Sequence, residues 1–411
     1  MIDERNYWLA FSVFSGVGPI RFKMLLNQFG RAKDAWRATT LDLSKAIGEK
    51  LTEKFDKFRN TFSIRDYTRR LLAQGVSFII TTDKEYPKLL SQIKNPPFVL
   101  FVKGDTTTLY SLSDQASSEN REVLSEDGSR QARTIIPTIA VVGTRRTTSY
   151  GREVTKILTE ELVAAGFLIV SGLAIGIDTV SHKAAIEAGG KTIAVLGCGI
   201  DCCYPSANQS IYNSIIIGKG CVVSEYPLGQ APTRGSFPAR NRIIAGLSLG
   251  VLVTEGAEDS GSLITAGYGL KFGRKVFAVP GPITSSLSKG PYKLIAKGAR
   301  LVTSAEDILK EFKISTFAKA ASFAGLRFAE GFGKARVATK AESVDKQNSK
   351  FKNATNEEKK ILNILQNEQL HFDELVRRTG FESAKTGSIL SIMEIKGMIK
   401  SLESGQFSIS S

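Results

Sequence analysis

The stretch from Thr138 to Asp178 limits the possible fold more than any other part of the chain. It contains an apolar segment, a polar turn, an amphipathic segment and a second apolar segment that ends in a Gly-containing turn. This order predicts one βαβ unit. A turn between a strand and the following helix presents backbone N–H groups and the positive end of the helix dipole. Both turns of this unit are therefore candidate anion sites.

The first turn lacks the glycine spacing of a dinucleotide site, in which a GxGxxG loop presses its backbone against a pyrophosphate. Arginine binds phosphate in a bidentate manner and threonine adds a neutral donor, so a turn rich in both suits a phosphodiester. A solvated loop with incidental charge is the alternative. After Gly143 the residues of interest are Thr144, Arg145, Arg146 and Thr148, and the next glycine is Gly151.

Charge and hydropathy favour a polyanionic partner. The 411 residues include 55 Lys and Arg against 40 Asp and Glu, which gives a formal charge of +15 and a pI near 9.5. Such an excess suits nucleic acid or an anionic membrane surface. No basic amphipathic helix and no run of 18 apolar residues is evident, and the N-terminus lacks a signal pattern. We therefore expect a cytoplasmic protein that binds nucleic acid and no membrane.

Metal binding is not expected, because the four cysteines form no CxxC pair and the chain has two histidines. We expect reduced structural thiols, and no cofactor. The cysteines are Cys198, Cys202, Cys203 and Cys221.

The order of segments predicts four regions. Residues 1–70 have apolar positions at helical spacing, and the hairpin at residues 15–19 is typical of helix-hairpin-helix or SAM-like domains that bind DNA or serve only in packing. Residues 71–310 alternate strands and helices, which predicts an extended Rossmann-like, doubly wound sheet. Within them, residues 111–133 form a polar insertion, expected to be a loop or disordered.

The C-terminal part divides into a linker and a small domain. Residues 311–352 are predicted to be a basic flexible linker. Residues 353–411 contain three helical segments and two short strands, which predicts a winged-helix domain. Winged helices bind either duplex DNA or proteins, so the fold leaves the role of this domain open.

Two enzymatic interpretations find little support. Ser171, Asp178 and His182 have the residue types of a hydrolytic triad, but no GxSxG elbow is present and an Asp at a helix start is usually a cap. Lys191 follows a glycine as in a P-loop, but a strand follows it where the motif needs a helix. Lys191 remains a candidate phosphate contact.

Two further turns are candidate anion sites on the same sheet. One carries two arginines around an asparagine before an apolar helix, an arrangement that can hold successive phosphates or a base edge. The other has serine and glycine at a helix N-terminus. The first comprises Arg240, Asn241 and Arg242, and the second Ser260, Gly261, Ser262 and Thr265.

Six motifs together resemble the DNA-processing protein A family (DprA, also called Smf). In chain order they are VGTRRTTSYG, VSGLAIGIDTVSHKAA, IAVLGCGIDCCYP, SEYPLG, FPARNRIIAGLS and SGSLITA. The resemblance implies a homodimer with an extended Rossmann domain that binds single-stranded DNA without enzymatic turnover. It also implies delivery of that strand to the RecA recombinase during natural transformation.

The resemblance assigns DNA-binding positions to the first three turns. Ile175 departs from it by replacing a common Arg, which Arg146 or Lys183 compensates in this interpretation, and Tyr292 departs by replacing a common Asn. The first turn contributes Gly143, Thr144, Arg145 and Thr148, the second Ser171, Gly172, Gly176, Asp178 and His182, and the third Arg240, Asn241 and Arg242.

The leading hypothesis is a sequence-independent single-stranded DNA binder in which Arg145, Arg240 and Arg242 hold phosphates. A nucleotide-hydrolysing enzyme that uses Glu255 and Asp178 is one alternative. A protein adaptor that acts through its winged helix is another.

Overall fold

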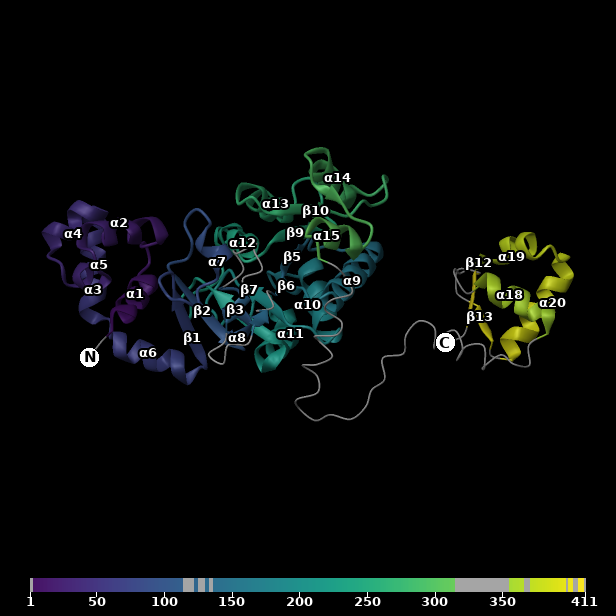
Figure 1. The fold of residues 1–411 in the computed structure, drawn as a ribbon, viewed down its shortest axis with the longest axis horizontal. Coiled ribbons are helices and arrows are strands. Elements are labelled where there is room, and N and C mark those ends of the chain that lie inside the picture. Colours follow the sequence, from purple (N-terminus) through teal and green to yellow (C-terminus); the bar gives the residue numbers. More distant parts are fainter. Residues whose placement is uncertain are drawn as a thin grey trace. The chain divides into compact units, whose positions relative to one another are not determined.

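The computed structural model describes residues 3–113, 122–124, 130–132, 136–314, 355–365, 370–396, 398–401 and 406–409. The chain divides into two compact units, 1–329 and 330–411, and each is described by itself. Figure 1 shows the elements of both units. No helix in these ranges is long and apolar enough to cross a bilayer.

Six helices form the N-terminal part around an aromatic core. The rings of Phe11 and Phe55 stack with centroids 5.1 Å apart, and the ring of Phe22 stacks 4.1 Å from Phe98, beside the sheet. The predicted Gly-flanked hairpin lies between the first two helices. The helices are α1 (Glu4–Val13), α2 (Pro19–Phe29), α3 (Ala32–Arg37), α4 (Thr40–Ile47), α5 (Glu49–Thr61) and α6 (Ile64–Ala73).

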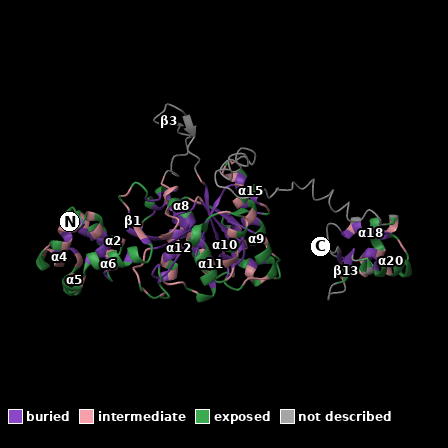
Figure 2. Ribbon diagram, turned by 90° about the horizontal axis from the view of Figure 1, so that it is seen from below, coloured by how far each residue is buried: buried purple, intermediate pink, exposed green. Residues whose placement is uncertain are grey.

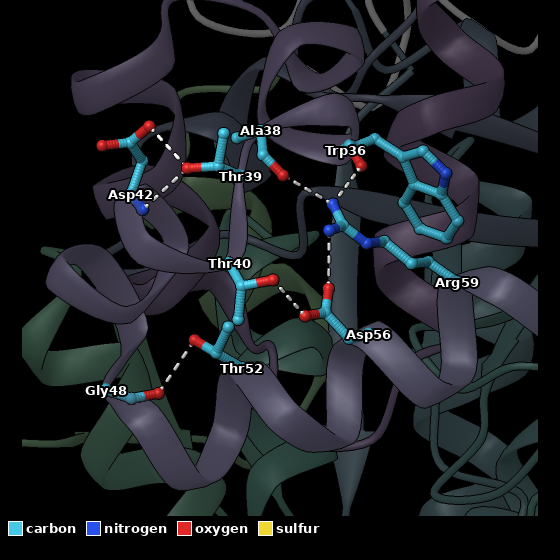
Figure 3. A network of polar contacts seen from close by, with 9 residues as sticks. All are labelled: Trp36, Ala38, Thr39, Thr40, Asp42, Gly48, Thr52, Asp56 and Arg59. Atoms are coloured by element: carbon cyan, nitrogen blue, oxygen red, sulfur yellow. Dashed lines mark hydrogen bonds and ion pairs between the residues drawn. The ribbon is translucent and has the colours of Figure 1, made fainter.

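A polar network holds α5 against the segment between α3 and α4 (Figure 3). The Arg59 guanidinium donates to the carbonyls of Trp36 and Ala38, each at 2.8 Å, and pairs with Asp56 at 2.6 Å. Asp56 also accepts from the Thr40 hydroxyl at 2.7 Å. These contacts satisfy the carbonyls at the end of α3 and tie α5 to the segment between α3 and α4.

The central sheet confirms the predicted doubly wound α/β fold. Its nine strands lie in the order β1-β2-β8-β7-β6-β5-β9-β10-β11; β2 is antiparallel to both of its neighbours, β1 and β8, and all other pairings are parallel. The chain runs outward from β5 to β8 and then returns to β9 on the other side of β5, which places a topological switch point at β5. The strands are β1 (Val76–Ile80), β2 (Val99–Gly104), β5 (Thr138–Val142), β6 (Leu168–Ser171), β7 (Thr192–Val195), β8 (Gly220–Ser224), β9 (Gly250–Val253), β10 (Lys275–Ala278) and β11 (Arg300–Leu301).

Alternate residues of the strands pack on opposite faces of the sheet. Ile139 and Val141 belong to the core beneath α9, α10 and α15, whereas Ala140 and Val142 belong to the core beneath α7, α12, α13 and α14. Figure 1 shows α12 and α13 on one side of these strands and α9 and α10 on the other, and Figure 2 shows the strands as buried. The helices are α7 (Lys88–Ser91), α8 (Thr106–Tyr110), α9 (Ser149–Ala164), α10 (Ile177–Glu187), α11 (Gln209–Ser214), α12 (Ser236–Gly246), α13 (Gly261–Lys271), α14 (Lys289–Ala296) and α15 (Ala305–Glu311).

Helix α11 ends at Ser214, and a π-helical turn containing Gly218 at φ +98° leads from it into β8. The polar insertion, predicted to be a loop or disordered, contains strands β3 (Glu122–Leu124) and β4 (Arg130–Ala132), which pair antiparallel. Residues 114–121 and 125–129 of the insertion, and residues 315–352 of the predicted linker, lie outside the described residues.

The second unit is a winged helix, as predicted. Three helices surround buried Leu375, Leu390 and Met393, and the three strands pair in the order β12-β14-β13. The first of these strands was not predicted. The elements are α18 (Asn356–Leu365), β12 (Leu370–His371), α19 (Phe372–Thr379), α20 (Ser383–Ile395), β13 (Ile399–Ser401) and β14 (Gln406–Ile409).

Candidate nucleic-acid interface

The turns that follow β5, β6 and β9 meet at the carboxyl edge of the sheet. The backbone N–H of Thr144 donates to the carbonyl of Glu255 at 2.7 Å, and the N–H of Ile177 donates to the carbonyl of Thr144 at 3.1 Å. Three turns that are far apart in sequence therefore form one hydrogen-bonded surface at the switch point.

Two glycines are required by this close approach of the turns. A Cβ at Gly143 would lie 2.7 Å from the carbonyl oxygen of Glu255. Gly176 has φ +93°, and a Cβ there would overlap the Thr144 carbonyl. These glycines let the turns after β5 and β6 touch one another. In a dinucleotide site, by contrast, the glycines let the backbone approach a cofactor.

A carboxylate of the chain occupies the N-terminus of α9. The Glu255 side chain accepts from the Thr148 N–H at 3.0 Å and from the Thr148 hydroxyl at 2.6 Å. The same hydroxyl accepts from the N–H of Gly151 at 3.0 Å and so caps the helix. Glu255 is 4% exposed. The groups of Thr148 that were predicted to receive phosphate are therefore bound internally to an anion.

The exposed cations of the first turn are Arg145 and Arg146. Within the described ranges, neither guanidinium forms an ion pair with a carboxylate. The Arg145 guanidinium lies 5.5 Å from the centroid of the Phe237 ring, and that ring lies 5.5 Å from the ring of Tyr204, which is 48% exposed. Neither aromatic residue was predicted to belong to the site, although both lie within the six family motifs.

Arg240 is buried beneath the second turn. It is 4% exposed, and its Nη1 donates to the carbonyls of Gly172 and Val195. The buried carboxyl of Asp178 accepts from the N–H of Gly172 at 3.1 Å and from that of Ala174 at 3.4 Å. Burial raises the pKa of Asp178 and lowers the pKa of Arg240, and the charge of each opposes the shift in the other. The backbone N–H and the backbone carbonyl of Gly172 are thus both hydrogen-bonded to buried side chains, those of Asp178 and Arg240.

The neighbours of Arg240 on α12 also have internal partners. Arg242 forms an ion pair with Glu225, and both side chains are largely buried. Burial raises the pKa of Glu225, while Arg242 opposes that shift. The Asn241 amide donates to the carbonyl of Gly261 at 3.3 Å and thereby joins α12 to the start of α13. The prediction that Arg240 and Arg242 hold phosphate at the surface does not agree with these positions.

A model of the family described as DNA recombination-mediator protein A matches residues 112–313, and a DprA winged-helix model matches residues 348–405. Protein Smf from Synechocystis sp. is 38% identical over 309 residues, which cover 75% of this chain and 72% of that protein. The chain belongs to the DNA recombination-mediator protein A family. The resemblance predicted from the six motifs is thereby confirmed.

Other family members match this chain as well. DNA processing protein DprA from Bacillus subtilis is 43% identical over 238 residues, or 58% of this chain and 72% of that protein. The X-ray structure of DNA processing protein A from Streptococcus pneumoniae superimposes with a TM-score of 0.62 at 35% identity, and the match covers 76% of this chain and 98% of that one.

The two departures from the family motifs have distinct surroundings. Ile175, in place of a common Arg, is 52% exposed. Lys183, a suggested replacement for that charge, lies 3.8 Å from Glu187, whereas Arg146 has no such acidic neighbour among the described residues. The Tyr292 hydroxyl donates to the carbonyl of Gly281 and so secures the loop after β10.

The other predicted members of this family's site serve as internal contacts or lie elsewhere. Ser260 caps α13 and contacts the Ser262 hydroxyl at 2.8 Å, whereas Ser262 and Thr265 are buried and Gly261 is exposed. Lys191 precedes β7, so it lies at the amino-terminal edge of the sheet, where it pairs with Asp105 at 2.5 Å. Strand direction therefore places Lys191 at the edge of the sheet opposite to the other candidates, and its role as a phosphate contact stays a prediction.

The Ser171 side chain hydrogen-bonds to the Asp178 carboxyl, whereas His182, the third residue of the unsupported triad, has a different partner. The Ser171 hydroxyl donates to the carbonyl of Val141 at 2.7 Å, and His182 Nδ1 lies 2.8 Å from the Thr192 hydroxyl. Burial lowers the pKa of His182 to about 3, and the charge of Arg240 acts in the same direction. In the part of the chain that the structure describes, no three His, Cys, Asp or Glu side chains group to suit a metal ion.

Proposed function

We propose that this chain binds single-stranded DNA without sequence preference along the carboxyl edge of its sheet. The observation that carries the proposal is the exposed Arg145 guanidinium beside the ring of Phe237, which neighbours the partly exposed ring of Tyr204. Proteins that bind single strands combine cations along the backbone with aromatic rings on which bases stack. This site offers both on adjoining turns.

The predicted site residues take two different roles in this proposal. Arg145 and Arg146 contact phosphates, and the net charge of +15 attracts the strand over a longer range. The buried groups Arg240, Asp178 and Glu255 do not contact DNA but hold the turns in the geometry that presents the arginines. His182, Ser171 and Thr148 support the same turns from within.

Hydrolysis of a nucleotide is less well supported by the geometry. The alternative needs Glu255 or Asp178 as a base that faces a substrate. The Glu255 carboxylate is engaged by Thr148, and that of Asp178 by two backbone N–H groups. We therefore propose that the chain is not an enzyme. Turnover of nucleoside monophosphates that disappears in Glu255→Gln would contradict this view.

The test is a salt titration of binding to a fluorescent oligothymidylate, measured by anisotropy. Wild-type affinity should fall linearly on a log–log scale, and Arg145→Ala should reduce the slope by about 0.7, because one cation no longer neutralises a phosphate. Lys191→Ala is the matched control, because it removes a cation from the opposite edge and should leave the slope unchanged. Flat salt dependence of the wild type, or a wild-type slope in Arg145→Ala, would refute the proposal.

We also propose that the bound strand is protected and passed to the RecA recombinase by a homodimer during natural transformation, as the family resemblance implies. The test is RecA filament formation on strands coated with a single-strand binding protein. The purified chain should accelerate that formation, and Arg145→Ala should accelerate it less.

The winged helix suits a protein partner better than duplex DNA, because several of its cations are already paired. Lys385 pairs with Glu357 at 2.6 Å, Lys396 pairs with Glu358 at 2.7 Å, and Arg377 pairs with Glu374 at 2.8 Å. These pairs reduce the positive charge available to a phosphate backbone. Deletion of residues 353–411 should therefore leave duplex affinity unchanged, and a clear decrease would favour a DNA-reading role.

A further inference from the structure

The loop between β10 and α14, residues 279–288, presents the most exposed large apolar side chain among the described residues. Ile283 is 89% exposed. A single exposed apolar side chain is ordinary on a protein surface. What distinguishes Ile283 is that its loop is fixed in place and lies on the edge of the sheet that carries the proposed DNA site.

Three hydrogen bonds anchor this loop near its two ends, and a fourth holds Gly290, just after it. The Tyr150 hydroxyl donates to the carbonyl of Pro280 at 2.5 Å, and the Tyr292 hydroxyl donates to the next carbonyl, that of Gly281. Near the other end, the Gly256 N–H donates to the carbonyl of Leu287 at 2.7 Å, and the Gly290 N–H donates to the carbonyl of Gly256 at 2.9 Å. Ile283 is therefore presented by a loop that is hydrogen-bonded near both of its ends.

The loop lies at the same edge of the sheet as the first turn of the candidate interface, the turn that follows β5. β10 is parallel to β9, and β9 is parallel to β5, so the loop leaves the same edge as the Gly143 turn. Two strand spacings separate β10 from β5, a distance of about 10 Å. Tyr150 joins the two segments, because it follows the cap Thr148 by two residues and its 37%-exposed ring lies against the Gly281 backbone.

The chemistry of the loop suits a base better than a phosphate. Residues 279–288 contain no charged side chain, whereas exposed Lys289 directly follows the loop and exposed Arg152 lies two residues after Tyr150. Phosphates of a strand that crosses this edge are attracted to the cations, and its unstacked bases are neutral and have apolar faces.

We propose that Ile283, with the exposed part of the Tyr150 ring, forms a second base-contacting surface for the single strand held at Arg145. This inference rests on the proposed function, because it extends the path of the same ligand. The strand then crosses the ends of β6, β5, β9 and β10 in turn, with phosphates at the arginines and one unstacked base against Ile283.

The test compares Ile283→Ser with Ile217→Ser in the full chain. Ile217 is a matched control because it is 80% exposed and lies just before β8, at the opposite edge of the sheet. Ile283→Ser should weaken binding of an oligothymidylate about fivefold, the order expected for partial burial of one apolar side chain, without changing the salt slope. Ile217→Ser should bind like wild type.

An abasic oligonucleotide separates bases from phosphates. Wild type and Ile283→Ser should bind it equally, because that ligand has no base to pack against Ile283. The inference is overturned if Ile283→Ser binds oligothymidylate like wild type, or if its defect persists on the abasic strand. A defect in RecA binding alone would overturn it in favour of a protein contact. If wild type binds no single strand at all, the proposed function itself fails.

Discussion

Arg240→Ala should mainly lower stability, whereas Arg145→Ala should mainly reduce the salt dependence of DNA binding. The reason is that the Arg240 side chain supports a turn from inside, whereas the Arg145 side chain faces solvent. Removal of Arg240 leaves the carbonyls of Gly172 and Val195 without their donor and leaves the buried Asp178 charge uncompensated. Removal of one partner from a buried pair of opposite charges costs about 3–5 kcal/mol. We expect a fall of that size in the free energy of unfolding of Arg240→Ala, measured by urea denaturation.

The salt dependence of DNA binding supplies the second readout. Arg240→Ala should bind single strands more weakly because the Gly172 turn is no longer held, but the slope of log affinity against log salt should stay that of wild type. Arg145→Ala should unfold within about 0.5 kcal/mol of wild type, as expected for an exposed side chain, and its salt slope should be smaller by about 0.7.

Two further variants keep the comparison interpretable if Arg240→Ala does not fold. Arg240→Lys keeps the positive charge but not the planar fork, so it should retain more stability than Arg240→Ala. Asp178→Asn in the Arg240→Ala background should recover part of the stability, because it removes the uncompensated charge. A reduced salt slope in Arg240→Ala, with unchanged stability, would refute the internal role and restore Arg240 as a phosphate contact.

Three other predictions follow from the buried polar groups. His182 has a pKa of about 3 in the folded chain and an ordinary value near 6.5 when unfolded, so its contribution to stability is present above pH 6.5 and is lost as pH falls toward 3; urea denaturation across that window should show a smaller pH slope in His182→Asn. Glu255→Gln should lower the free energy of unfolding by about 1–2 kcal/mol, since it removes a charge-assisted bond at the N-terminus of α9, and a neutral result in urea would contradict the capping role. Tyr292→Phe removes the hydrogen bond to Gly281 and should cost about 1 kcal/mol, while its thermal midpoint should fall by the matching few degrees.

The sequence was sufficient to predict the sheet, because its strands are apolar runs that alternate with helices and end in recognisable turns. It was also sufficient to locate the first turn, where Arg145 and Arg146 face solvent as expected. Arg240 is buried, although its residue type suggested a surface contact. Its spacing from Ile243 and Ile244 is i, i+3 and i+4, the pattern of a face turned to the core, and this signal was available.

Other differences have equally local reasons. Lys191 comes before its strand and not after it, so strand direction already placed it away from the other candidates. The partner of Thr148 could not be predicted from sequence, because Glu255 is 107 residues away and the two meet only when β5 and β9 pair. Contacts between turns depend on strand order, which no local pattern specifies.

The carboxylate of Glu255 at the start of α9 has a consequence for competition inside a cell. A group tethered to its own site has an effective concentration that a diffusing mononucleotide does not match. We therefore expect free nucleotides to be kept out of this position, where a related sheet would seat a cofactor phosphate. In the proposed function a long strand is not excluded in this way, because it gains its affinity from several exposed contacts at once, so the chain should discriminate polymer from monomer without any gate.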